Sequence, residues 1–245
     1  MSAAAIQDVP VEVLQEIFVQ ACTDGGTTGC SISLVSQAFR AAVQPIQYHS
    51  IELTGLAQIS TFASRYTETC SALAAADPLR GHPKVRHLLL TSHRDMRRRS
   101  VYAHEEADKT EALAAIANLL ALLAPDLHTL VLITAYRHTD LFQGCEGGFP
   151  CLRDLTMARI HGIDLPDLGA PKLPPEMRFP RLERLHFALR VVNRSLEQLL
   201  SHWTMLAPAV VELRLSNLPP RATRAGLNTA FCACPTFLQR QCGEY

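Results

Sequence analysis

Cysteine and histidine are the residue types in this sequence best suited to metal binding or catalysis, and neither forms a recognised pattern. Cys232 and Cys234, with Cys242 nearby, give a Cys-x-Cys spacing, whereas common zinc knuckles use Cys-x-x-Cys pairs. The ten histidines include no His-Glu-x-x-His pattern, and the chain has neither a Gly-x-Ser-x-Gly nor a Gly-x-x-x-x-Gly-Lys motif. We therefore expect a non-catalytic protein without a cofactor or metal. An enzyme whose Cys and His residues meet from distant positions is the alternative.

Charge is balanced over the whole chain. Lys plus Arg (23) equal Asp plus Glu (23), so no overall field attracts phosphate backbones, and we expect no nucleic-acid partner. A basic cluster at Arg94 and residues 97–99 is followed by acidic residues at 105, 106 and 108. The interpretation we favour is a solvated insertion, with a nuclear-import patch or a substrate-binding loop as alternatives.

The composition predicts a folded chain that does not cross a membrane. Hydrophobic residues make up 48% of the 245 residues and charged residues 19%, which suffices for a continuous core. The longest apolar run, from Ala112 to Ala124, is well short of the ~20 residues that cross a bilayer. The first ten residues lack the basic and apolar regions of a secretory signal. We expect a cytoplasmic or nuclear protein with reduced cysteines.

Helical spacing dominates the first third of the chain. A first helix is expected over residues 10–21 and a second over residues 31–43, joined by a glycine-rich turn and ended by Pro45. A β-favouring piece, Tyr48 to Leu53, then leads into a third helical pattern from Leu56 to Tyr66. One face of the first helix is apolar, with the members Pro10, Val13, Leu14, Ile17, Phe18 and Ala21.

From residue 85 a six-residue unit, L-x-x-L-x-L, recurs. Its copies begin at Val85, Leu127, Leu152, Leu182 and Val210, and the last three intervals lie near the 20–29 residues of leucine-rich repeats. The apolar positions alternate as in a strand, and helical patterns lie between some of the units. One strand and one helix cannot bury their own apolar faces, so neighbouring units must stack in parallel. The alternate strand positions, Val131, Thr156, His186 and Arg214, are expected to project outward.

The N-terminal pattern resembles a known family. "VPVEVLQEIF", followed by "CSISLVSQAFRAAVQPIQYHSIEL", resembles an F-box, closely over about residues 6–53. The chain is similar to the F-box-like proteins abundant in mushroom-forming fungi, in which this module precedes a degenerate leucine-rich-repeat body.

This resemblance implies a role in protein degradation. Such modules dock on a Skp-type adaptor and, through it, on a cullin, while the repeats hold an unknown substrate protein. The resemblance gives adaptor binding to nine residues: Val9, Pro10, Val13, Leu14, Ile17, Phe18, Leu34, Val35 and Phe39. The docking mode is that of an apolar helix face in a groove.

The expected fold class is α/β. An F-box-like helical module, residues 1–55, precedes a short, irregular leucine-rich-repeat-like solenoid with a parallel sheet, residues 56–245, which binds the substrate. The expected function is that of the substrate-recognition subunit of a Skp/cullin/F-box ubiquitin ligase, which contributes proximity rather than chemistry. The alternative is a non-ligase leucine-rich-repeat interaction scaffold or a decayed paralogue.

Overall fold

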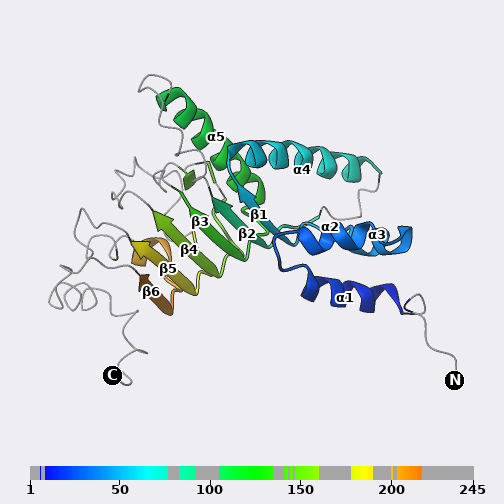
Figure 1. Ribbon diagram of the computed structural model, residues 1–245. Helices are drawn as coiled ribbons and strands as arrows, with labels where there is room; N and C mark the ends of the chain where they lie inside the picture. The colour runs from blue at the N-terminus through cyan, green and yellow to red at the C-terminus, as the bar shows by residue number, and fades with distance from the viewer. Residues whose placement is uncertain are drawn as a thin grey trace.

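The computed structural model describes residues 6, 9–76, 83–91, 105–134, 141–142, 144–145, 147–159, 178–189, 200 and 203–216. Its labelled helices are α1 (Val11–Ala21), α2 (Thr27–Ser33), α3 (Gln37–Val43), α4 (Leu56–Ala76) and α5 (Glu105–Leu123). Its strands are β1 (Ser50–Thr54), β2 (His87–Thr91), β3 (Thr129–Ile133), β4 (Asp154–Arg159), β5 (Arg184–Leu189) and β6 (Glu212–Ser216). Figure 1 shows the sheet with α4 and α5 beside it and with α1, α2 and α3 at the β1 end.

The six strands form one parallel sheet in chain order, β1-β2-β3-β4-β5-β6. The α/β class and the parallel sheet expected from the sequence are therefore confirmed. The residue just before each strand forms a row across the sheet, which we call the strand-start row. The carbonyl of Arg86, for example, accepts the N–H groups of His128 and Thr129 at 2.8 and 3.0 Å. The row consists of His49, Arg86, His128, Arg153, Glu183 and Val211.

The recurring apolar positions align from strand to strand. Leu88, Leu130 and Leu155 are register partners, and Leu90, Leu132 and Met157 form the next row. All six side chains are buried, as their place in the repeated unit predicts. Because every second side chain of a strand points to the same face, the unit buries one face of the sheet, and the other face carries polar side chains together with some aliphatic ones.

A sixth copy of the unit, "YHSIEL" at residues 48–53, provides the first strand. Ile51 and Leu53 pair in register with Leu88 and Leu90, and both are buried. The expected boundary at residue 55 falls just after β1, so the segment assigned to the helical module contains a strand of the sheet. Tyr48 stands where the other copies have leucine or valine, and it packs at the edge of the core.

The two long helices cover the buried face of the sheet (Figure 1). Ile59 and Tyr66 of α4, with Ile116 and Leu120 of α5, share one hydrophobic core with the strand leucines. The Tyr66 hydroxyl donates a 2.5 Å hydrogen bond to the carbonyl of Pro83, so its polar atom is satisfied inside the core. The opposite face carries no labelled helix in the described part of the chain.

The helical module has its own small core. Leu14, Phe18, Cys22, Ala42 and Val43 are buried together, separately from the sheet core. The rings of Phe18 and Phe39 meet edge to face, 5.5 Å apart. The module therefore uses the first-helix periodicity for its interior, as expected of an amphipathic helix.

The second expected helix, over residues 31–43, is wrong in its bounds. Two short helices stand there, α2 from Thr27 and α3 from Gln37, with a break at residues 34–36. Ser36 is extended, and its side-chain oxygen accepts the N–H of Phe39 at 3.1 Å. Serine at this position satisfies an orphan N–H of a new helix, which is why the chain restarts there.

The glycine turn between α1 and α2 contacts the edge strand of the sheet. Gly25 and Gly26 have φ of +74° and +102°, which favours glycine at both positions. The carbonyl of Gly25 accepts the N–H of Glu52 in β1 at 3.3 Å. A Cβ on Gly25 would lie 2.8 Å from the Cβ of Glu52, so the turn lies directly against the edge strand.

Candidate docking surface

Helix α1 divides the predicted adaptor-binding residues between an interior and an exposed face. Leu14 and Phe18 are only 8% and 6% exposed and belong to the module core. Val13 and Ile17, one position before each of them, are 47% and 53% exposed. Since adjacent helical residues point about 100° apart, a run of paired apolar residues is wide enough to fill a core and also cover an outer face.

The break between α2 and α3 presents two further aliphatic side chains. Leu34 is 77% exposed and Val35 is 66% exposed. Their N–H groups donate to the carbonyls of Ser31 and Ile32, both at 3.1 Å. The Arg40 Nε donates to the carbonyl of Ser33 at 3.0 Å, which closes the end of α2. The turn is thus fixed by hydrogen bonds while its apolar side chains point into solvent.

The remaining predicted residues lie at the margins of these two groups. Val9 and Phe39 are half-buried against the module core, and Pro10 is exposed just before α1. The nine predicted residues thus comprise two in the core, two at its edge and five on the surface. The surface set consists of Pro10, Val13, Ile17, Leu34 and Val35.

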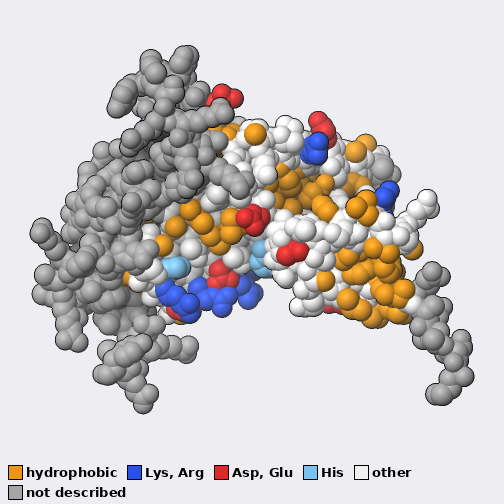
Figure 2. Space-filling model, in the orientation of Figure 1, with side chains coloured by type: hydrophobic (Ala, Val, Ile, Leu, Met, Phe, Trp, Pro, Cys, Tyr) orange, Lys and Arg blue, Asp and Glu red, His pale blue; other side chains and the backbone are white. Residues whose placement is uncertain are grey.

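Two exposed apolar residues were not among those predicted. Ile6 and Val11 are exposed by about half. Val11 lies three residues before Leu14 and seven before Phe18, so its helical spacing alone predicts a buried position rather than an exposed one. Together with Val13, Ile17, Leu34 and Val35 they make up what we call the apolar patch. Figure 2 shows hydrophobic side chains gathered over the α1 end of the molecule.

Polar side chains stand beside the apolar patch on α1. Glu12 and Glu16 are both exposed on this helix. Asp24, after α1, accepts the Thr28 N–H and hydroxyl, the latter at 2.7 Å, and these hydrogen bonds lower the pKa of Asp24. Exposed apolar side chains rimmed by polar residues are typical of a protein-binding surface.

The open face of the sheet is a second candidate surface. Val131, Thr156, His186 and Arg214 lie in one row by register, as their positions in the unit predict. The first three are half-buried and Arg214 is exposed. His186 Nε2 lies 2.7 Å from the Ser216 hydroxyl, within hydrogen-bond distance.

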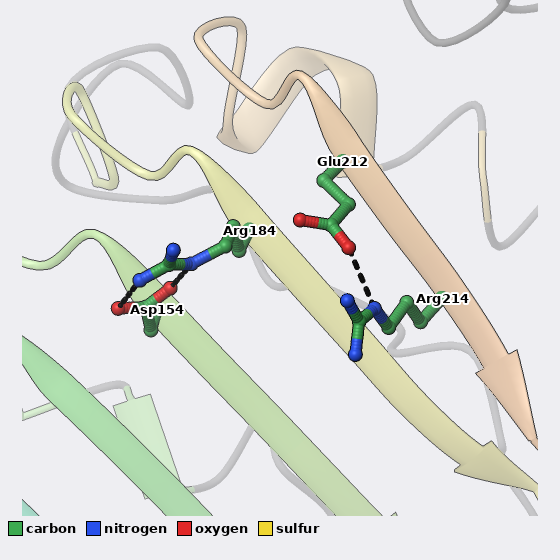
Figure 3. Close-up of polar contacts among 4 residues, drawn as sticks. All are labelled: Asp154, Arg184, Glu212 and Arg214. Carbon is green, nitrogen blue, oxygen red and sulfur yellow. Dashed lines mark hydrogen bonds and ion pairs between the residues drawn. The ribbon is translucent and has the colours of Figure 1, made fainter. Parts of the chain in front are cut away.

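Ion pairs neutralise much of this face near β4, β5 and β6. Arg184 makes a two-point contact with Asp154, including a 2.6 Å bond from Nη2 to Oδ2. The Nε of Arg214 donates to Oε1 of Glu212 at 2.6 Å. Figure 3 shows the first pair bridging β4 and β5 and the second lying along β6. These exposed pairs position side chains more than they stabilise the fold.

Histidines collect at the start of the first three strands. The His49 ring packs edge to face with that of His87, 5.0 Å between centroids. Burial, followed by the nearby His87, lowers the pKa of His49 to about 4. Burial also lowers the pKa values of His87 and His128. Among the described residues, no group of three His, Cys, Asp or Glu side chains is placed to hold a metal ion.

Some sequence-based candidates lie outside the described residues. They are the basic cluster at Arg94 and 97–99 and the cysteines Cys232, Cys234 and Cys242. In the described ranges, no helix is long and apolar enough to cross a membrane.

Comparison with protein-family models found no match to this chain, and the curated proteins and solved structures gave none either. The F-box resemblance therefore stays a prediction from the sequence motif. The geometry of the two surfaces is independent of that resemblance.

Proposed function

We propose that the chain is an F-box-like substrate-recognition subunit of a Skp/cullin-type ubiquitin ligase. The apolar patch of the helical module docks on the adaptor, and a leucine-rich-repeat-like sheet receives the target. The observation that carries the proposal is the exposure of Val13, Ile17, Leu34 and Val35 on a module with a closed core of its own. A folding role alone leaves these four side chains unexplained, because the core is complete without them.

The apolar patch is large enough to contribute to binding, but only if most of its side chains are buried together. Full burial of an aliphatic side chain yields ~1.5–3 kcal/mol, so burying the exposed parts of these four side chains yields roughly 4–7 kcal/mol. Association costs about 4–15 kcal/mol in lost freedom. Docking must therefore use nearly the whole patch, including Ile6 and Val11, and one charged substitution should abolish it.

The second half of the proposal assigns target binding to the open face of the sheet. Its outward row runs across six adjacent strands and is uncovered by labelled helices in the described part of the chain. Repeat sheets of this kind present extended binding surfaces. The contribution to ubiquitin transfer is positional, since holding the target near the conjugating enzyme raises its effective concentration.

Co-purification of the full chain with a fungal Skp-type adaptor tests the proposal. Ile17→Asp and Leu34→Asp place a charge in the apolar patch without entering the core, so both variants should keep wild-type circular dichroism and lose the adaptor. Val211→Asp is the matched control, because Val211 is 57% exposed but lies in the strand-start row. Adaptor capture by all three variants, or by none including wild type, would overturn the proposal.

The structure also shows which substitutions in α1 can test docking without unfolding the module. The sequence alone makes Leu14→Asp and Ile17→Asp equally attractive, yet Leu14 belongs to the core. A charge there costs several kcal/mol and unfolds the module, so its loss of binding would say nothing about docking.

A further inference from the structure

Two arginines flank a histidine in one part of the strand-start row. Arg86, His128 and Arg153 are successive members of this row, each linked to the next by a 2.8 Å bond from N–H to carbonyl. Both arginine side chains are exposed and His128 is half-buried. Figure 2 shows Lys and Arg side chains gathered along the lower edge of the sheet, with histidines beside them.

Among the described residues, the two arginines differ from their neighbours in having no ion-pair partner. Lys84, Arg184 and Arg214 pair with Asp126, Asp154 and Glu212. Within the residues that the structure describes, no acidic group forms an ion pair with Arg86 or Arg153. Their charges also reach His128, whose pKa is lowered by burial and then by these two guanidinium groups. A row of this kind gains by binding an anion.

Beyond this row, the open face of β2 and β3 carries aliphatic side chains. Leu89 and Val131 are register partners on β2 and β3, each three residues beyond its row member, Arg86 or His128, and both are partly exposed. Nucleic acid would meet these aliphatic side chains with its backbone, whereas a peptide can place a hydrophobic side chain on them. The row ends in the exposed acidic residue Glu183, which limits the positive stretch to three strands.

We propose that Arg86, His128 and Arg153 bind an acidic peptide segment of the target protein, with a hydrophobic residue of the same segment on Leu89 and Val131. This inference rests on the proposed function only in calling the ligand a target. Neighbouring strands lie about 4.8 Å apart, so Arg86 and Arg153 are separated by roughly 10 Å across the sheet. An extended peptide rises ~3.3 Å per residue, and carboxylates three residues apart match that separation. Guanidinium groups bind carboxylates with directed, charge-assisted hydrogen bonds.

Fluorescence anisotropy with the full chain and a labelled peptide carrying two Glu three residues apart, followed by Leu, tests the inference. Arg86→Gln and Arg153→Gln should each weaken binding about fivefold, which is the change in affinity expected when one exposed ion pair is lost. Arg65→Gln on α4 is the charge-matched control, because this exposed arginine lies on the helix that covers the other face, and it should bind as wild type. Glu183→Gln should tighten binding.

Three comparison ligands decide the chemistry. The Gln version of the peptide should bind at least tenfold more weakly, and equal binding would overturn the inference. Tighter binding of a phosphoserine peptide, or of a single-stranded oligonucleotide, with the same loss in Arg86→Gln would replace the acidic segment by that ligand and also overturn it. Ile17→Asp should bind the peptide normally, so failure of the adaptor test and failure of this test are distinguishable.

Discussion

Gly25 is the position where a single methyl group should separate the helical module from the sheet. Its φ of +74° is unfavourable for alanine, and a Cβ there would lie 2.8 Å from the Cβ of Glu52. Carbon atoms pack at about 3.5–4.0 Å, so the turn would have to move away from β1 by most of an ångström. That movement also stretches the 3.3 Å hydrogen bond from the Glu52 N–H to the Gly25 carbonyl.

The expected cost of Gly25→Ala has two parts. Left-handed backbone costs a residue with a Cβ about 1–2 kcal/mol, and an overpacked contact costs about 1–3 kcal/mol. Gly55→Ala provides the control, because Gly55 has φ of +101° but nothing within 4 Å of an added Cβ. We therefore expect a loss of about 2–5 kcal/mol at Gly25 and about 1–2 kcal/mol at Gly55.

Urea unfolding followed by circular dichroism measures both losses in the full chain. Hydrogen exchange adds a local measurement, since the Glu52 amide should exchange faster in Gly25→Ala but not in Gly55→Ala. If Gly25→Ala destabilises the protein no more than Gly55→Ala, or leaves Glu52 protected, the contact between turn and edge strand has been misjudged.

Further predictions concern the core, pH and surface charge. Leu130→Ala removes a fully buried side chain and should cost ~2–5 kcal/mol in urea unfolding. The pKa of His49 is about 4 in the folded protein against 6.5 for an ordinary histidine, so the folded state resists protonation. Stability should therefore fall as the pH drops from about 6.5 towards 4, by at most ~1.4 kcal/mol per pH unit, and His49→Gln should reduce that fall. Arg184→Ala breaks the exposed pair with Asp154 and should change the free energy of unfolding by less than about 1 kcal/mol.

The elements with strong periodicity were predictable from the sequence. Leu14 and Phe18 follow helical spacing, and the strand leucines follow the period of two, because a buried face repeats with the geometry of its element. The copies starting at Val85 and Leu127 place Leu88 and Leu130 on neighbouring strands, and the register bears this out.

Two local features were harder to predict. Val35 and Phe39 have helical spacing, yet Ser36 between them starts a new helix, because an N-cap competes with helix continuation at the same position. The segment from Tyr48 to Leu53 was predictable as β-favouring but not as a copy of the repeat, because Tyr48 replaces the usual leucine and the segment also fits the end of the F-box pattern.

The candidate surfaces depend on facts that a single sequence does not contain. Val13 and Leu14 are equally apolar, and only the packing of α1 against α3 decides which of them faces solvent. In the same way, Arg153 and Arg184 are both arginines beside a strand start, but only Arg184 meets Asp154 across the strands. Pairing between strands, rather than residue type, determines where unneutralised charge remains.

The order of the strands has a consequence for how the chain matures. Each described strand after β1 pairs with the strand that precedes it in the chain. During synthesis, each of these strands therefore emerges after the strand with which it pairs. No described strand has to stay unpaired until a later partner is synthesised. The sheet can therefore form from the N-terminal strand onward. We expect fewer non-native strand pairings than in sheets whose neighbouring strands are far apart in the sequence.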